Sequence, residues 1–383
     1  MFVSLKEILR NELFEQAEVL AGSEGLGRNA KRISVFDCPC REDLIKREIL
    51  REGDLFITCL EQFKHDEENI SRFIDTLLYT DSAGLIVVSE DMIHILNPAV
   101  LKRCNEGNLP VVLLKEEIPY AAIIDTVNKY IAIDNMHALN MLKLEKIMYG
   151  NISFEEKMET LYSINPNVKQ YVRVISVDGE FNSDIAQLEL HMYYLDKKSD
   201  IYVRSGHNMI FILSDDSQNA LRRHSDAAAV RFSEFLDNPV AGYSRIAARK
   251  EIEHTLEEAK RALETAKAMQ ISRQTYDPLS VLQLLLLVRD SREAGDFYQK
   301  YVDMIRSHVS AENLQETLRT MEVYVANSGN FQDTARILNQ HENTIRYRVN
   351  KVKQALDMEN DNIKFHETIA IAVKLRTLLH EKI

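Results

Sequence analysis

Residues 328–352, SGNFQDTARILNQHENTIRYRVNKV, decide how the carboxy-terminal part of this chain is expected to fold. Gly329 can end a preceding helix, and Asn330 can cap the next one, with Asp333 three residues on as a capping-box partner. A four-residue turn then separates this short helix from a second helix that begins near Asn343. A short helix, a tight turn and a second helix together predict a helix-turn-helix.

The second helix of this motif has two different faces. At ~100° per residue, its apolar side chains fall in one narrow stripe, which predicts a buried face. The opposite face and its flanks carry amides, hydroxyls and cations, which can contact base edges and phosphates. The apolar stripe consists of Ile345, Val349, Val352 and Leu356. The residues expected to contact DNA are Asn343, Thr344, Arg346, Tyr347, Arg348, Asn350 and Lys351.

Positive charge is concentrated on this helix in an otherwise acidic protein. The 383 residues carry a formal charge of −12, yet residues 327–357 hold five basic and three acidic side chains, a balance of +2 that leaves −14 elsewhere. A local basic surface on an acidic chain is typical of sequence-specific DNA binding. The alternative is a solvated basic face on an ordinary helical hairpin.

The same stretch resembles the carboxy-terminal helix-turn-helix of the PucR/CdaR group of bacterial transcriptional regulators. The resemblance rests on Gly329-Asn330, Ala335, Leu338 and the run from His341 to Arg348, preceded by Leu314 to Leu318 and Tyr324. It implies DNA binding and promoter-specific regulation, often activation.

The first part of the chain, residues 1–128, alternates apolar runs with segments of helical spacing. The runs lie around Val35 and at 55–59, 85–88 and 111–114. Continuous apolar strands separated by helices predict a parallel sheet that is covered on both faces. With its Gly53-Asp54-Leu55-Phe56-Ile57-Thr58 and earlier glycines, this part resembles the amino-terminal PucR domain, which implies small-molecule sensing. Some members of the family respond to purine-breakdown products.

An effector is expected at the carboxyl ends of these strands, because open α/β sheets bind ligands there. The candidates are polar residues that directly follow the strands. They are Asp37, Thr58, Cys59, Ser89 and Lys115.

Residues 129–165 predict a helical connector, which either pairs with a copy of itself or packs on a neighbouring domain. Residues 166–270 predict a second α/β unit with a hairpin at 201–213. This hairpin weakly resembles the R-x-G-G-D-E-F signature of diguanylate cyclases, but Asn208 and Met209 replace its metal-binding acids. We therefore expect a degenerate, cyclase-like relay domain without enzymatic activity; a cyclase or nucleotide hydrolase carrying a helix-turn-helix is the alternative.

Three cysteines leave another alternative open. Cys38 and Cys40 follow one expected strand and Cys59 follows another, so three thiols can meet at one sheet edge to form a metal or redox sensor. The spacing is not that of a zinc pair, and cysteine is often a core residue. No metal or other cofactor is therefore expected.

The overall expectation is a multidomain α/β plus all-α protein, with the helix-turn-helix domain at 278–383. Its expected partners are double-stranded DNA, a small-molecule effector and further copies of the chain, as a homodimer or a higher homo-oligomer. The longest apolar run, near 281–288, is far shorter than the ~20 residues that span a bilayer. No signal peptide is apparent, so a cytoplasmic protein without membrane contact is expected.

Overall fold

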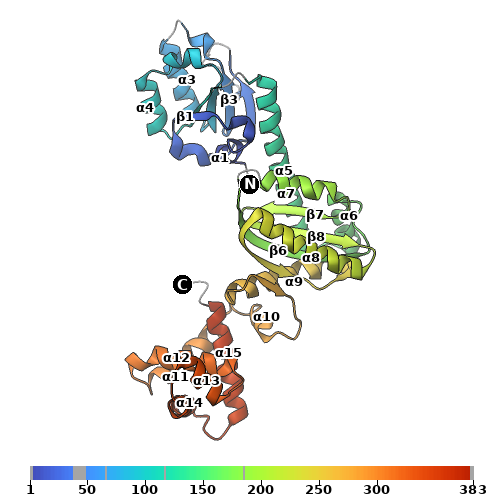
Figure 1. Ribbon diagram of the computed structural model, residues 1–383, viewed down its shortest axis with the longest axis vertical. Helices are drawn as coiled ribbons and strands as arrows, with labels where there is room; N and C mark the ends of the chain where they lie inside the picture. Colours follow the sequence, from blue (N-terminus) through green and yellow to red (C-terminus); the bar gives the residue numbers. More distant parts are fainter. Residues whose placement is uncertain (1–2, 38–48, 65–66, 116–117, 184–185, 380–383) are drawn as a thin grey trace. The chain divides into compact units, whose positions relative to one another are not determined.

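The computed structural model describes residues 3–37, 49–64, 67–115, 118–183 and 186–379. The chain divides into two compact units, which are described separately (Figure 1). The first comprises Met1–Val172 and Gly179–Pro239, and the second comprises Arg173–Asp178 and Val240–Ile383.

A five-stranded sheet forms the amino-terminal part of the first unit, in the order β1-β5-β4-β3-β2. Strands β2 to β5 are parallel, as the apolar runs predict, while β1 pairs antiparallel with β5. The antiparallel edge strand was not expected from the sequence. The strands are β1 (Ala17–Ala21), β2 (Arg32–Val35), β3 (Asp54–Thr58), β4 (Gly84–Val87) and β5 (Val111–Leu114).

Both faces of this sheet are covered, which explains the continuous apolar runs. The side chains of α3 (Glu67–Tyr79) and α4 (Pro98–Glu106) form one core with one face, in which Phe56 and Phe73 take part. The other face packs against α1 (Leu5–Ile8) and the beginning of α5 (Tyr120–Tyr149), through residues such as Ile57, Ile86 and Ile123. A mixed α/β amino-terminal region is therefore confirmed.

The expected connector is helical but has a break. Helix α5 runs to Tyr149, and α6 (Phe154–Ile164) begins after a capping box formed by Ser153 and Glu156. The apolar residues of α5 differ in burial, and neither alternative for the connector is tested by this. Leu144 and Ile147 are buried, whereas Leu139 and Leu142 are exposed.

The second sheet has the strand order β11-β9-β6-β8-β7, with β10 paired to β6. The expected hairpin is present as β7 and β8, which pair antiparallel across Gly206 and His207. The strands are β6 (Tyr171–Phe181), β7 (Ile201–Ser205), β8 (Asn208–Asp215), β9 (Leu236–Tyr243), β10 (Ala247–Ala248) and β11 (Arg273–Thr275), and the helices between them are α7 (Ala186–Asp196), α8 (Gln218–Phe235) and α9 (Ile252–Ala268).

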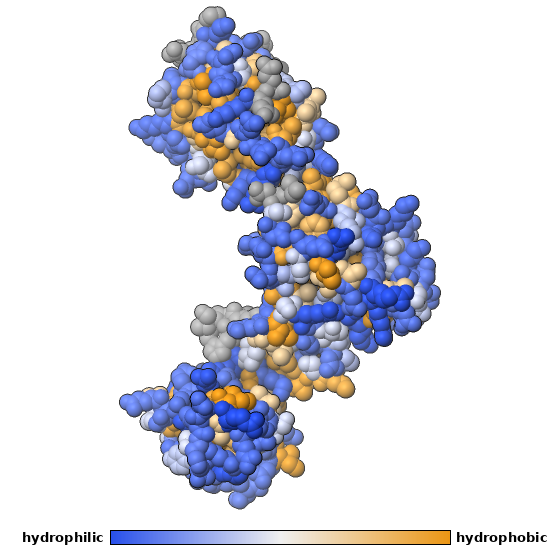
Figure 2. Space-filling model, in the orientation of Figure 1, coloured by the Kyte–Doolittle hydropathy of each residue, from blue (hydrophilic) through white to orange (hydrophobic). Residues whose placement is uncertain are grey.

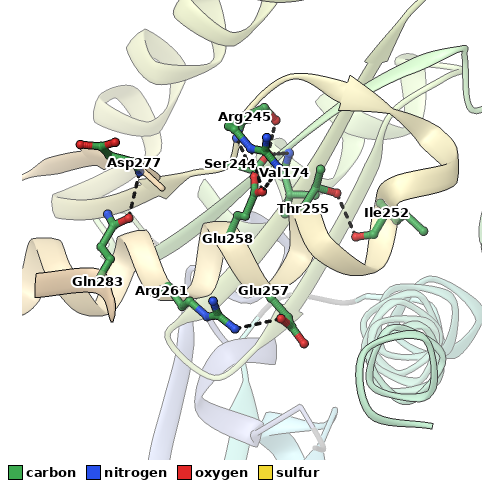
Figure 3. A network of polar contacts seen from close by, with 10 residues as sticks. All are labelled: Val174, Ser244, Arg245, Ile252, Thr255, Glu257, Glu258, Arg261, Asp277 and Gln283. Atoms are coloured by element: carbon green, nitrogen blue, oxygen red, sulfur yellow. Dashed lines mark hydrogen bonds and ion pairs between the residues drawn. The ribbon is translucent and has the colours of Figure 1, made fainter. Parts of the chain in front are cut away.

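Helix α9 packs closely on β9 in the second unit. Arg245, just after β9, forms an ion pair of 2.5 Å with the buried carboxylate of Glu258 on α9 (Figure 3). The hydroxyl of Ser244 accepts a hydrogen bond from the backbone N–H of Val174 at 2.9 Å. The ion pair fixes the end of β9 to α9, and the Ser244 hydrogen bond joins it to β6.

The remainder of the second unit is helical, as expected. The core of these helices includes Tyr301, Met321, Ile345 and Phe365. The helices are α10 (Val281–Leu285), α11 (Arg292–Arg306), α12 (Ala311–Ala326), α13 (Phe331–Leu338), α14 (Glu342–Ala355) and α15 (Asn362–Leu379).

Short 3-10 helices also occur among the described residues of both units. They are η1 (Glu12–Phe14), η2 (Ser23–Gly27), η3 (Glu61–Phe63), η4 (Glu90–Ile95) and η5 (Arg249–Glu251).

Hydrophilic residues cover most of the face seen in Figure 2. Within the described ranges, no helix combines the length and apolar composition needed to cross a bilayer.

Candidate nucleic-acid interface

The entry into α13 depends on a glycine, as the sequence predicts. Gly329 has φ +77°, and its N–H donates to the carbonyl of Tyr324 at 2.8 Å, which ends α12. A Cβ at Gly329 would lie 3.3 Å from the Tyr324 hydroxyl in a backbone region that L residues rarely adopt. The side chain of Asn330 then caps α13 by accepting from the N–H groups of Gln332 and Asp333. The Asp333 carboxylate accepts from Arg336 at 2.7 Å.

The turn between α13 and α14 has a left-handed residue followed by a cap. Asn339 has φ +53°, and the N–H of Gln340 donates to the carbonyl of Ala335 at 3.0 Å. His341 caps α14 through its Nδ1, which accepts from the N–H of Asn343 at 3.2 Å. Ala335 is buried in the core that these helices share, so a larger side chain would disturb their packing. This geometry forms the expected helix-turn-helix.

Helix α14 has the two faces that its sequence predicts. The apolar stripe of Ile345, Val349, Val352 and Leu356 is buried in the core of the domain. That burial fixes the rotation of the helix and leaves its polar face toward solvent. The exposed members of the expected contact set are Asn343, Thr344, Arg346, Tyr347 and Asn350, and Lys351 is half-buried beside them.

Arg346 and Lys351 are held in place by aromatic rings. The Arg346 guanidinium lies 4.3 Å from the centre of the Phe331 ring and pairs with Glu342 at 2.6 Å. The Lys351 ammonium lies 5.5 Å from the ring of Tyr347. These contacts restrict the two cations before any ligand binds, which reduces the entropy lost on binding.

Arg348 differs from the other six residues. Its side chain is only 15% exposed, and its guanidinium contacts Glu316 on α12 at 2.5 Å. It also donates to the Gln340 side chain at 2.8 Å and to the Thr320 hydroxyl at 3.1 Å. The structure therefore uses Arg348 to connect α12, the turn and α14, and we assign it a positioning role.

Arg348→Met should accordingly lower the free energy of unfolding of this domain, because Arg348 loses three hydrogen-bond partners. The expected loss is only about 1–2 kcal/mol, because water partly screens the charge of Glu316. Arg346→Met is the matched control, with an expected change within about 0.5 kcal/mol. Hydrogen exchange of the α12 and α14 amides measures the effect on this domain alone. Equal protection in both variants would remove the positioning role.

A second polar cluster lies at the carboxyl edge of the first sheet. One Asp37 carboxylate oxygen accepts from the Thr58 hydroxyl at 3.1 Å and from the Cys59 N–H at 3.2 Å. The other accepts from the Tyr120 hydroxyl at 2.9 Å. Burial and the hydrogen bond to Asp37 raise the pKa of Tyr120 above its ordinary value, so it remains a hydrogen-bond donor. Asp37, Thr58 and Cys59 are thus brought together, as the topology predicts.

Ser89 and Lys115 have other surroundings. Ser89 precedes η4 after strand β4, and the Lys115 ammonium pairs with Glu18 on β1 at 2.8 Å. Tyr120, which starts α5 and reaches back to Asp37, is not among the residues predicted from the sequence. Neither is Leu60, which lies beside this cluster and has a φ of +64°, a strained value for a leucine.

Of the three cysteines in the metal or redox hypothesis, the structure describes only Cys59. Cys38 and Cys40 lie outside the described residues. Cys59 is half-buried, with its sulfur 3.6 Å from Asp37, whereas Cys104 is buried, which raises its pKa to about 11. In the part of the chain that the structure describes, no three His, Cys, Asp or Glu side chains are grouped to hold a metal ion.

Asn208 and Met209 of the β7–β8 hairpin, which replace the acids of the cyclase signature, do not form a metal site. Met209 is buried in the core and Asn208 is exposed at the turn. A thioether and an amide cannot replace the charged oxygen ligands of a metal-bound triphosphate.

The capped α13, the left-handed turn and α14 define a helix-turn-helix domain of the DNA-binding class. Comparison with protein families agrees with this: residues 317–375 match the PucR C-terminal helix-turn-helix domain, and residues 7–131 match the purine catabolism regulatory protein-like (PucR) family. The chain therefore carries the PucR-family amino-terminal domain and the PucR carboxy-terminal helix-turn-helix domain. Neither match includes the hairpin of β7 and β8.

Two individual proteins are similar to parts of the chain. The DNA-binding transcriptional activator AdeR of Bacillus subtilis (strain 168) is 25% identical over 104 residues, which is 27% of this chain and 24% of AdeR. The match thus spans about a quarter of that relative's length. The crystal structure of a regulator of polyketide synthase expression from Bifidobacterium adolescentis aligns with 66% of this chain and 99% of its own, at 12% identity and a TM-score of 0.31.

Proposed function

We propose that this protein is a sequence-specific DNA-binding transcription regulator in which α14 enters the major groove. The observation that carries the proposal is the exposed face of α14, where Asn343, Thr344 and Tyr347 lie beside cations on a helix whose opposite face is buried. In helix-turn-helix proteins, residues at the start of the second helix contact base edges. Asn343, Thr344 and Arg346 occupy this position here.

The proposed division of roles follows the sequence. Residues 1–128 bind an effector, 129–165 connect, 166–270 form a non-enzymatic relay, and 278–383 bind DNA as part of a homodimer. An effector can act in such an arrangement only through different affinities for DNA-competent and DNA-incompetent states. Activation is the proposed sign of regulation, supported by the similarity to an activator.

Selection of bound fragments from a genomic DNA library tests the proposal. We expect the wild-type protein to enrich discrete sites and the variant Asn343→Ala/Arg346→Ala to lose them. Arg292→Ala on α11 is the matched control, because Arg292 is also an exposed arginine in an ion pair four residues away along its helix. Equal enrichment by all three proteins would show that α14 is the wrong helix, and enrichment by none, with or without candidate metabolites, would contradict DNA binding.

The Asp37 cluster is the proposed effector site within the first domain. A thermal-shift screen of metabolites, starting with purine-breakdown products because of the family's name, supplies the ligand. We expect Asp37→Asn to weaken that ligand by about 10-fold or more, because a charged hydrogen-bond acceptor is lost. Asp125→Asn, an exposed carboxylate on α5, should bind normally. Unchanged binding by Asp37→Asn would place the effector elsewhere.

A further inference from the structure

Helix α10 and the residues after it have an unusual composition for a partly exposed segment. Residues 278–288, PLSVLQLLLLV, contain no charged side chain, in a protein of which 28% of the residues are charged. Hydrophobic residues lie on all sides of the helix. A helix that is hydrophobic all round is normally buried on all sides.

One side of α10 is indeed buried within the second unit. Leu282 and Leu286 pack with Leu378 of α15, and Ala268 of α9 lies against the same cluster. The buried Gln283 side chain accepts a hydrogen bond from the backbone N–H of Asp277 at 2.9 Å (Figure 3). These contacts fix the orientation of the helix.

The other side of α10 is exposed. Leu284 is 64% exposed, Leu287 is 55% exposed, and Leu279, just before the helix, is 88% exposed. Val281 and Val288 also face solvent, so five large hydrophobic side chains are exposed within ten positions. Figure 2 shows hydrophobic surface over the α10 region. We call these five residues the α10 face.

The size of the α10 face is sufficient to contribute to a stable interface. Its five side chains expose on the order of 400–500 Å² of apolar surface, whereas monomeric proteins rarely expose a contiguous patch above a few hundred Å². Two such faces in contact would remove roughly twice that area from water. With a polar rim, this falls in the range of about 1,200–2,000 Å² that specific protein interfaces bury.

The charge pattern indicates which partner fits. An acidic protein repels its own copy over most of its surface, but the α10 face is uncharged and can meet itself without like-charge repulsion. A two-fold interface brings the same patch of both subunits together, so it requires a self-complementary surface of this kind. A charged or nucleic-acid partner would find no complementary group there.

We propose that the α10 face is the surface through which two copies of this chain associate. Because α10 packs on α15 of the helix-turn-helix domain, association there connects the two DNA-binding domains directly. The spacing of two recognition helices is then set close to the domains that contact DNA, as binding to paired half-sites requires. The oligomeric part of this inference does not depend on DNA binding.

Sedimentation velocity of the full chain over a range of concentrations tests the surface. We expect wild type to be dimeric at about 10 µM, a typical concentration for such an experiment, and Leu284→Glu to raise the dimer dissociation constant at least about 100-fold. Leu284→Met should remain dimeric, because it keeps an apolar side chain of similar size. The variant Leu139→Glu/Leu142→Glu changes the exposed hydrophobic residues of α5 and should also remain dimeric.

A monomeric wild type would overturn the inference, as would a Leu284→Glu protein that stays dimeric. If only the Leu139→Glu/Leu142→Glu variant were monomeric, the dimer interface would lie on α5 and the inference would be wrong. Circular dichroism checks that Leu284→Glu remains folded, which is expected because residue 284 faces solvent. Each result is independent of DNA binding, so failure of this inference is distinguishable from failure of the proposed function.

Discussion

Asn343→Ala should weaken binding to a selected DNA site by roughly 10- to 100-fold while leaving binding to random DNA nearly unchanged. An asparagine amide can form two hydrogen bonds with adenine, and a good bidentate contact is worth about 1–3 kcal/mol of discrimination. Asn343 is exposed at the first turn of α14, and in helix-turn-helix proteins the first turns of the second helix contact base edges. Fluorescence anisotropy with the selected site and a scrambled duplex measures both affinities.

Lys351→Ala provides the contrast within the same helix. Its ammonium is expected to contact phosphate, so its loss should weaken binding to both duplexes and lower the salt slope, d log K/d log [salt], by about 1. Arg292→Ala should change neither quantity. If Asn343→Ala instead weakened both duplexes equally, the amide would contact the backbone and the sequence would be recognised by other residues.

Gly242→Ala should destabilise the second unit by at least about 3 kcal/mol. A Cβ at this position would lie 2.0 Å from the backbone nitrogen of Leu263 and 2.4 Å from the carbonyl oxygen of Ala259. Both atoms belong to the backbone of α9, which cannot give way as a flexible side chain would. The helix must therefore move away from β9, with loss of the Arg245–Glu258 pair.

Gly295→Ala on α11 is the matched control for this substitution. Its Cβ would meet no atom within 4 Å, and alanine favours a helix over glycine by about 1 kcal/mol, so a small stabilisation is expected. Urea denaturation followed by circular dichroism, with hydrogen exchange in α9, measures both variants. A Gly242→Ala protein as stable as wild type would contradict the close packing of α9 on β9.

Features with a local cause were predictable from the sequence. The buried strands of the first sheet were evident from apolar runs, and the rotation of α14 from the angles of its apolar stripe. The end of α12 and the N-terminal cap of α13 followed from Gly329 and Asn330, since both act on neighbouring backbone groups. One long-range feature, the grouping of Asp37, Thr58 and Cys59, was also expected, because the topology of a parallel sheet brings the carboxyl ends of its strands to one edge.

Features that depend on particular contacts between distant side chains or strands were not predictable. Arg348 resembles its neighbour Arg346 in sequence, but its role depends on Glu316, which is 32 residues away and reaches it only through the packing of α12. Strand β1 has the sequence AEVLA, whose alanines and glutamate favour a helix as much as a strand, and pairing with β5 decides its conformation. Tyr120 reaches Asp37 across 83 positions for the same reason.

The contacts of Gln283 have a consequence for engineering chimaeric regulators. A junction at Asp277-Pro278 is attractive in the sequence, but it would separate α10 from the strand end that holds it, because Gln283 contacts both Asp277 and the Thr275 carbonyl. Arg289, just beyond α10, also pairs with Glu264 of α9. A transplanted DNA-binding module should therefore retain α9 and β11. A fusion made at the proline would leave α10 without the contacts that fix its orientation.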